Sequence, residues 1–325
     1  MLNASTPFWP VDGILILCLE LTTLVACGLA WVITAHPGIF LLEKIMNLYM
    51  LSDVTSAFGR NHIITVGVCL FLIILGSILI VKKDVKFEKI LNIMLILWLC
   101  SEAIKMVYGL KYLLSDGTTI EILKYKAQEG ITIVSAFYPR DYLPLHMCSL
   151  QPLLMLIVKF TKNENLKDKI LKFMFPTCIL GAFIAIVVAT VGCAFNDLIV
   201  YEYFLFHTAL VIYGISIMTR KKITITFKSH LETLGILTVV FISSIWVNSI
   251  LSDTNSNHVI MGVEDIDLYT NFLYSMKPPM EGLPLLNLNH GWFVYFFTIV
   301  LLGLVLITLI HLPFMIKNRK LEIKE

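Results

Sequence analysis

Long apolar stretches recur along nearly the whole chain and are separated by shorter polar segments. Eight of them are long enough to cross the hydrocarbon layer of a bilayer, which takes about 20 residues of helix. They lie near residues 11–35, 63–82, 88–110, 143–160, 170–193, 197–218, 230–251 and 291–315. Pro, Gly and ionisable residues interrupt several, which a bundle tolerates because neighbouring helices satisfy the freed polar groups. The pattern predicts an all-α fold, a polytopic transmembrane bundle of about eight helices.

The first apolar stretch leaves an alternative open. Leu24 to Cys27 resembles a lipoprotein cleavage box, and cleavage there would leave seven helices and an external amino terminus. Glu20 in the apolar run and the lack of Lys and Arg before it favour retention. The chain shows no internal repeat, so we expect one bundle. The expected parts are an amino-terminal helix and external loop at 1–50, the bundle at 51–315 and a basic tail at 316–325.

The composition agrees with a membrane protein and argues against several other classes. Of the 325 residues, 58% are hydrophobic and 15% are charged, and the mean hydropathy is +0.83. Soluble domains contain about 45–50% apolar residues. The net charge of +2 is carried in short clusters, which argues against a nucleic-acid partner. The seven cysteines form no Cys-x-x-Cys pair, so no disulfide framework, zinc module or cofactor is expected.

Most Lys and Arg residues collect in segments that fall on one side of the predicted bundle. These basic segments are 82–89, 159–172, 219–228 and the carboxyl-terminal tail. Positive-inside bias predicts that this side is cytoplasmic, with both termini in the cytoplasm. The longer segments 36–62, 111–142 and 252–290 are then external loops.

Polar side chains within the apolar stretches concentrate in the external half of the bundle. Ionisable groups are costly in hydrocarbon, so each one is a functional hypothesis. The set comprises His62, Glu102, Lys105, His146, Cys148, Gln151, Asn196, Asp197, Glu202, His207, Asn248 and His290. We therefore expect any chemistry near the non-cytoplasmic face.

Cys148 is the candidate nucleophile in this half. Pro144 suits a helix start, which places Cys148 about 7–8 Å below the outer boundary. His146 is two residues away and points to another face of a helix, so a base has to come from a neighbouring helix. His207 fits this role, because Tyr203 lies one turn before it and can orient its ring.

Structural interpretations stand beside the catalytic one. A cysteine is a common small apolar filler, and membrane histidines often make only interhelical hydrogen bonds. Glu102 and Lys105 are three residues apart and can neutralise each other. His36, His230, His258 and His311 are assigned to solvent or interface.

Two other functions remain open. A metal-dependent membrane hydrolase would use His62, His146, His207 and His290 as ligands, with Glu102 or Asp197 as base, but no two of these histidines have the i, i+4 spacing of helical ligands. A transporter or scaffold would use the polar groups to line a path or to join helices. Transport is less favoured, because the sequence shows no inverted symmetry.

Four segments carry a resemblance to a known family. They are Leu143 to Cys148, Phe58 to His62, Phe206-His207, and Asn271 to Pro278. Together they resemble the YwaF-like bacterial integral membrane proteins, over roughly residues 50–315. The last segment has Phe272 where Tyr is more usual in that family.

The YwaF-like proteins are similar to an animal multi-pass acyltransferase that moves fatty acyl chains between phospholipids through a cysteine. The resemblance implies Cys148 as nucleophile, His207 or His146 as base, and membrane phospholipids or lysophospholipids as substrates. Asn196, Asn271 or Gln151 would donate to an oxyanion, and Lys105, Arg140 or Lys277 would hold a phosphate. The candidate substrate-binding residues are His62, Glu102, Lys105, Gln151, Asn196, Tyr203, Asn271 and Lys277.

Overall fold

The computed structural model describes most of the chain from Gly59 onward. The described ranges are 59–113, 119–124, 127–133, 143–188, 198–251, 260–261, 270–278 and 286–322. The predicted first helix at 11–35 and the candidate residues Arg140, Asn196 and Asp197 lie outside them.

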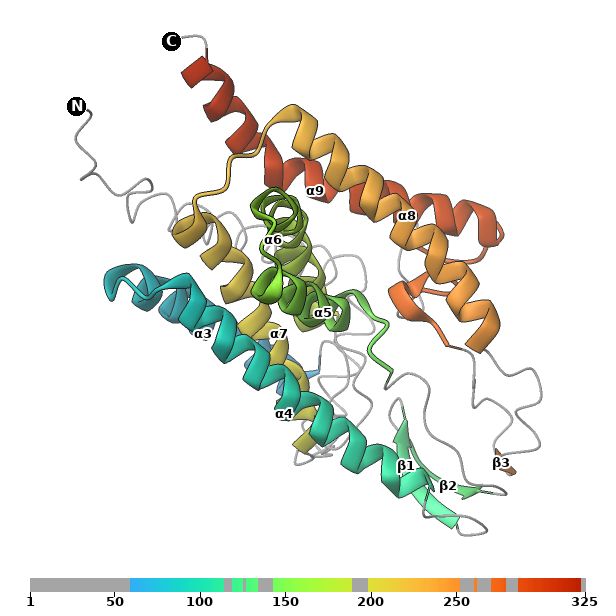
Figure 1. Ribbon diagram of the computed structural model, residues 1–325. Helices are drawn as coiled ribbons and strands as arrows, with labels where there is room; N and C mark the ends of the chain where they lie inside the picture. The colour runs from blue at the N-terminus through green and yellow to red at the C-terminus, as the bar shows by residue number, and fades with distance from the viewer. Residues whose placement is uncertain are drawn as a thin grey trace.

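A bundle of helices forms the described part of the chain (Figure 1). The helices are α3 (Arg60–Lys82), α4 (Phe87–Leu113), α5 (Met147–Phe160), α6 (Glu164–Val187), α7 (Leu198–Ser216), α8 (Phe227–Leu251) and α9 (Trp292–Glu322). A π-helical turn, η2 (Ile217–Lys221), extends α7. Among the described helices, six are long and apolar enough to cross a membrane, and α5 is the shorter apolar one. The predicted helical transmembrane bundle is confirmed.

The short helix α5 corrects one predicted span. We expected a helix from 143 to 160 that begins at Pro144, but the helix begins at Met147 with His146 as its N-cap. The residues before it form a turn in which the Leu145 N–H donates to the Leu143 carbonyl at 2.8 Å. With 14 residues, α5 is about 21 Å long, less than the thickness of the hydrocarbon layer.

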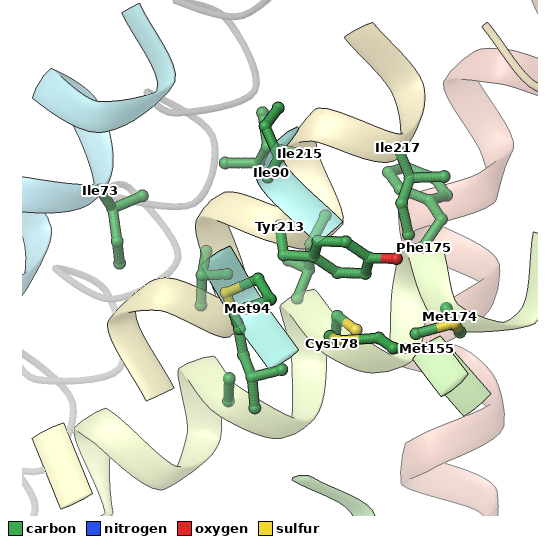
Figure 2. Close-up of a cluster of buried hydrophobic side chains, with 14 of the residues drawn as sticks. Ile73, Ile90, Met94, Met155, Met174, Phe175, Cys178, Tyr213, Ile215 and Ile217 are labelled. Carbon is green, nitrogen blue, oxygen red and sulfur yellow. The ribbon is translucent and has the colours of Figure 1, made fainter. Parts of the chain in front are cut away.

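The hydrophobic core is centred on α6 and α7. Side chains from α3, α4, α5 and α6 surround α7, and Tyr213 is completely buried among them. Figure 2 shows the Tyr213 ring between Met94 of α4 and Phe175 of α6. The outer helices instead expose large apolar side chains, such as Phe71 of α3 and Trp246 of α8. Such surfaces suit contact with lipid.

Helices α8 and α9 form a pair that packs on α6 (Figure 1). A small apolar cluster of Phe173, Leu237 and Ile307 joins the three helices. The pairing also buries His230 and His311, whose Nδ1 atoms are 3.1 Å apart. Their assignment to solvent or interface was wrong, because each lies on the helix face that the other helix covers.

The basic segments meet at one end of the bundle. The Arg220 guanidinium at the end of η2 pairs with Asp84 in the turn between α3 and α4. Lys159 at the end of α5 lies 3.6 Å from Glu88 at the start of α4. Asn318 of α9 donates to a backbone carbonyl between η2 and α8 at 2.8 Å. We call this the basic end; that it faces the cytoplasm stays a prediction.

A small antiparallel sheet joins two segments that we expected to be loops. Its strands are β1 (Thr119–Lys124), β2 (Ala127–Ile133) and β3 (Ile260–Met261), in the order β1-β2-β3. Thr132 of β2 is opposite Thr119 on one side and Met261 on the other. The sheet follows the end of α4 that lies away from the basic end (Figure 1).

Candidate functional site

A loop at residues 270–278 closes the end of the bundle opposite the basic end, and Asn248 of α8 holds it in place. The Asn248 amide donates to the Phe272 carbonyl at 3.0 Å and to Ser275 Oγ at 2.8 Å. Its oxygen accepts from the Phe272 N–H at 2.8 Å. Asn248 is 0% exposed. Its side chain supplies the hydrogen bonds that the backbone of this loop does not obtain from a sheet or a long helix.

Asn271 organises the same loop from within. Its side-chain oxygen accepts from the N–H groups of Met276 and Lys277, at 3.1 and 3.2 Å, and its amide donates to the Lys277 carbonyl at 2.8 Å. These bonds use the side-chain oxygen and one of the two amide N–H groups of Asn271. Its role toward a substrate oxyanion stays a prediction.

The backbone of this loop is strained. Leu273 and Tyr274 form most of the short 3-10 helix η4 (Phe272–Tyr274), and both have positive φ, 59° and 54°. Consecutive non-glycine residues rarely adopt this conformation. Two groups of α9 support it: the Tyr295 hydroxyl donates to the Tyr274 carbonyl, and the Trp292 indole donates to the Ser275 carbonyl at 3.0 Å. Such supported strain is typical of functional loops.

The 270–278 loop packs against His146 at the start of α5. The Phe272 ring meets the His146 imidazole edge-on, with centroids 4.9 Å apart, and the Tyr274 ring is 6.3 Å away. The loop therefore covers the amino-terminal end of α5.

Cys148 lies directly below this contact, as the second residue of α5. It is half-buried, and its Sγ would lie 3.8 Å from a Cβ added to Gly181 of α6. The backbone N–H groups of the first helical turn have no acceptor within the helix. Pro152 has no N–H, so the Cys148 carbonyl also lacks its helical partner. The thiol is thus next to free backbone donors, which stabilise developing negative charge.

His207 of α7 is held in one tautomer. Its Nδ1 lies 2.6 Å from the Tyr203 carbonyl oxygen, which can only accept, so Nδ1 carries the proton. In a neutral imidazole Nε2 then has a free lone pair. The Tyr203 ring packs against the imidazole, with centroids 4.3 Å apart, so the predicted orienting role of Tyr203 agrees with its position.

Lys105 of α4 completes the site. Its ammonium is 3.0 Å from the Glu102 carboxylate, which also accepts from Trp98 at 3.2 Å. The predicted pairing of Glu102 and Lys105 is present. The Lys105 ammonium also lies 5.9 Å from the centre of the Phe206 ring. Phe206 precedes His207 in α7, so the Lys105 ammonium lies beside the turn of α7 that carries the candidate base.

Two further residues lie in this region: Tyr274, which was not among the polar residues singled out from the sequence, and Glu202, which was singled out without a specific role. Tyr274 approaches His146 through the strained loop, for which the sequence has no glycine signal. Glu202 of α7 accepts from Ser101 of α4 and interacts electrostatically with Lys105. A carboxylate inside an apolar helix was the available signal for Glu202.

Other predicted site residues have structural partners instead. His62 donates from Nε2 to the Ile186 carbonyl at 2.9 Å, and the Tyr203 hydroxyl donates to the Ala185 carbonyl at 3.0 Å. Both therefore cap the last carbonyls of α6, which have no helical partner. Lys277 lies half-buried in the 270–278 loop.

Gln151 is completely buried between α5 and α6. Its amide donates to Thr177 at 3.1 Å, and its oxygen accepts from Cys178 at 3.3 Å.

Among the described residues, no three His, Cys, Asp or Glu side chains lie close enough together to hold a metal ion. Within that part of the chain His290 is exposed and His62 is engaged with α6, so the four histidines of the hydrolase hypothesis do not converge.

Comparison with known proteins identifies a family. The TMEM164 family matches residues 57–311, which is most of the chain and includes the candidate site. No curated protein and no solved structure matches the sequence. Of the six membrane-length helices among the described residues, the matched segment contains five completely and most of the sixth. The chain therefore belongs to the TMEM164 family, a family of multi-pass membrane proteins.

Proposed function

We propose that this protein is a membrane acyltransferase that moves fatty acyl chains between phospholipids, with Cys148 as nucleophile and His207 as base. One observation carries the proposal. A half-buried thiol lies in the first turn of α5, where backbone N–H groups have no acceptor within the helix. At the same end of the bundle, α7 supplies a histidine with a free Nε2 lone pair and α4 supplies the Lys105 ammonium.

The first half of the reaction transfers the acyl chain to the enzyme. His207 Nε2 takes the Cys148 thiol proton, and the sulfur forms a bond to the acyl carbonyl carbon of a phospholipid ester. The free N–H groups of the first turn of α5 stabilise the oxyanion. The ester C–O bond breaks, the leaving alkoxide takes the proton from His207, and a lysophospholipid leaves a thioester on Cys148.

The second half returns the acyl chain to a lipid. His207 takes the proton of a lysophospholipid hydroxyl, whose oxygen forms a bond to the thioester carbon. The C–S bond breaks and the Cys148 sulfur recovers the proton, so no cofactor is consumed. Lys105 is suited to hold the lipid phosphate, since ammonium groups bind phosphate well.

The dyad requires one adjustment. Cys148 makes no hydrogen bond to His146 or His207 within the described residues. Catalytic pairs are often longer without substrate, so the proposal requires that Sγ and Nε2 approach each other when a lipid binds. His146 is the second choice of base, because its ring is packed against Phe272.

The experiment uses purified full-length protein in phospholipid micelles with isotope-labelled lysophospholipid, read by lipid mass spectrometry. Cys148→Ala and His207→Ala are compared with wild type, and Cys100→Ala is the matched control, because Cys100 is an exposed thiol on α4. We expect label in diacyl lipid with wild type and Cys100→Ala only. A thioester-linked acyl group should also appear on Cys148 in intact-protein mass spectra. Unchanged turnover by Cys148→Ala would exclude the thiol mechanism.

A further inference from the structure

A groove of about 450 Å³ lies between α6 and α8, toward the basic end and therefore remote from the candidate site. Its volume is in the range of pockets that bind small molecules. The α8 side of the groove extends from Ser229 to Val240, which corresponds to about 16 Å along the helix axis. That length suits a lipid headgroup and the first part of an acyl chain.

The polarity of the groove changes along its length. Lys169 and Lys172 from the start of α6, and Glu232 from the start of α8, line its outer part. Ile236 and Val239 line the part nearer the membrane interior. This sequence of charged and then apolar surface matches the order of groups in a phospholipid at a bilayer boundary.

The space in the groove is open and its hydroxyl groups are already used. A Cβ added to Gly235 would meet no atom within 4 Å. Thr233 donates to the Ser229 carbonyl at 3.0 Å, and Ser229 donates to the Thr226 carbonyl at 2.9 Å. Because both hydroxyl hydrogens are used in this way, the side-chain donors that remain for a ligand phosphate are the two lysines.

The charges favour one kind of headgroup. Lys169 is exposed and forms no ion pair with any described residue, and Lys172 pairs with Asp168 on its own helix at 2.6 Å. Both lysines suit a phosphate. A purely anionic headgroup would bring its negative charge beside Glu232, whereas a headgroup that also carries an ammonium satisfies both signs. A primary ammonium adds hydrogen-bond donors that a quaternary one lacks.

We propose that this groove binds a phospholipid whose headgroup carries a phosphate and a primary ammonium, as in phosphatidylethanolamine. The phosphate lies on Lys169 and Lys172, the ammonium on Glu232, and one acyl chain along the apolar wall of α8. A lipid in this position bridges the α8–α9 pair to α6, so its binding stabilises the folded protein. The proposal does not depend on the proposed catalytic activity.

The test measures lipid retention by native mass spectrometry and thermal unfolding in detergent. Full-length protein is supplied separately with phosphatidylethanolamine, phosphatidylglycerol and phosphatidylcholine. We expect phosphatidylethanolamine to be retained best and to raise the Tm most. Equal retention of the three lipids, retention of none, or a preference for phosphatidylglycerol would each overturn the assignment.

Two charge variants separate the headgroup contacts. Lys169→Gln should weaken phosphatidylethanolamine binding about tenfold, since it removes one charged phosphate contact. Glu232→Gln should remove the preference over phosphatidylglycerol. Lys162→Gln is the matched control, because it removes the same charge from an exposed position in the same basic segment outside the groove. If both groove variants bind lipids as the control does, these residues do not recognise the headgroup.

Discussion

At the scale of single residues, the hydrogen bonds of each buried polar side chain determine whether that side chain is available to react. Cys148, Lys105 and His207 stand out in the sequence because a polar group in an apolar stretch is itself the signal. Their joint action in a catalytic site stays a prediction. Gln151 is also a polar residue in an apolar stretch, but its side chain is hydrogen-bonded to Thr177 and Cys178. That difference depends on how α5 and α6 are rotated toward each other, which a sequence pattern does not contain.

The space beside the thiol provides the first prediction. Gly181 lies next to Cys148, and a Cβ at this position would make ordinary contacts, 3.5 Å from Met147 Cγ and 3.8 Å from Cys148 Sγ. We expect Gly181→Ala to fold and to keep most of its activity. Gly181→Leu should fill the space beside the thiol and lower acyl transfer about 100-fold, because reacting groups tolerate little displacement.

The measurement pairs the transfer assay with the rate of Cys148 alkylation by a small maleimide. Both rates should fall together in Gly181→Leu. If Gly181→Leu stays active and its Cys148 reacts with maleimide at the normal rate, the acyl chain does not bind in the space beside Gly181.

At the scale of elements, the length of the apolar stretches predicted the long helices well but did not predict where they begin and end. A membrane-length apolar run requires a helix, since every backbone polar group must be paired in lipid. The start of α5 was misplaced because Pro144 fits both a first helical turn and the turn that precedes one. The 270–278 loop was not foreseen either, because its conformation depends on Asn248 from another helix.

The crossing of α6 and α7 depends on a glycine. A Cβ at Gly214 would lie 2.7 Å from Ile179 Cγ1 and 3.2 Å from the Phe175 carbonyl oxygen. Because a backbone atom is among these neighbours, the helices must separate to make room. Gly214→Ala should therefore destabilise the protein by about 1–3 kcal/mol. Gly67→Ala is the control, since its Cβ would meet nothing within 4 Å and it should be neutral or slightly stabilising. Thermal unfolding of both variants in detergent would reveal the difference, and equal Tm values would contradict this account.

The 270–278 loop is expected to depend on Asn248 alone among the polar residues of α8. Asn248→Ala leaves the buried Phe272 N–H without its partner, at a cost of about 1–3 kcal/mol. It also removes one of the donors to the Phe272 carbonyl, which keeps the N–H and hydroxyl of Ser275. We expect faster hydrogen exchange in the loop and loss of acyl transfer, with α8 still folded. Asn289→Ala changes an exposed amide nearby and should have neither effect. Protection that persists in Asn248→Ala would mean that Trp292 and Tyr295 suffice to hold the loop.

On the scale of the whole molecule, the two ends of the bundle differ in chemistry. One end gathers the basic segments and the groove between α6 and α8. The other end holds Cys148, His146, His207 and the 270–278 loop, which packs against His146. The ordering of charge along the sequence predicted this division, because alternate connections of an antiparallel bundle return to the same side of a membrane.

The orientation of these ends in the membrane gives the last prediction. Positive-inside bias places the basic end in the cytoplasm, and the candidate site would then use lipids of the outer leaflet. Lys83 is exposed at the basic end and His290 is exposed before α9 at the other. In intact cells a membrane-impermeant maleimide should label His290→Cys, whereas Lys83→Cys should react only after permeabilisation. The parent protein, treated in parallel, accounts for its native thiols. The reverse labelling pattern would place the thiol site at the cytoplasmic leaflet and the groove at the outer leaflet. The candidate site would then use lipids of the cytoplasmic leaflet, and the groove would bind lipids of the outer leaflet.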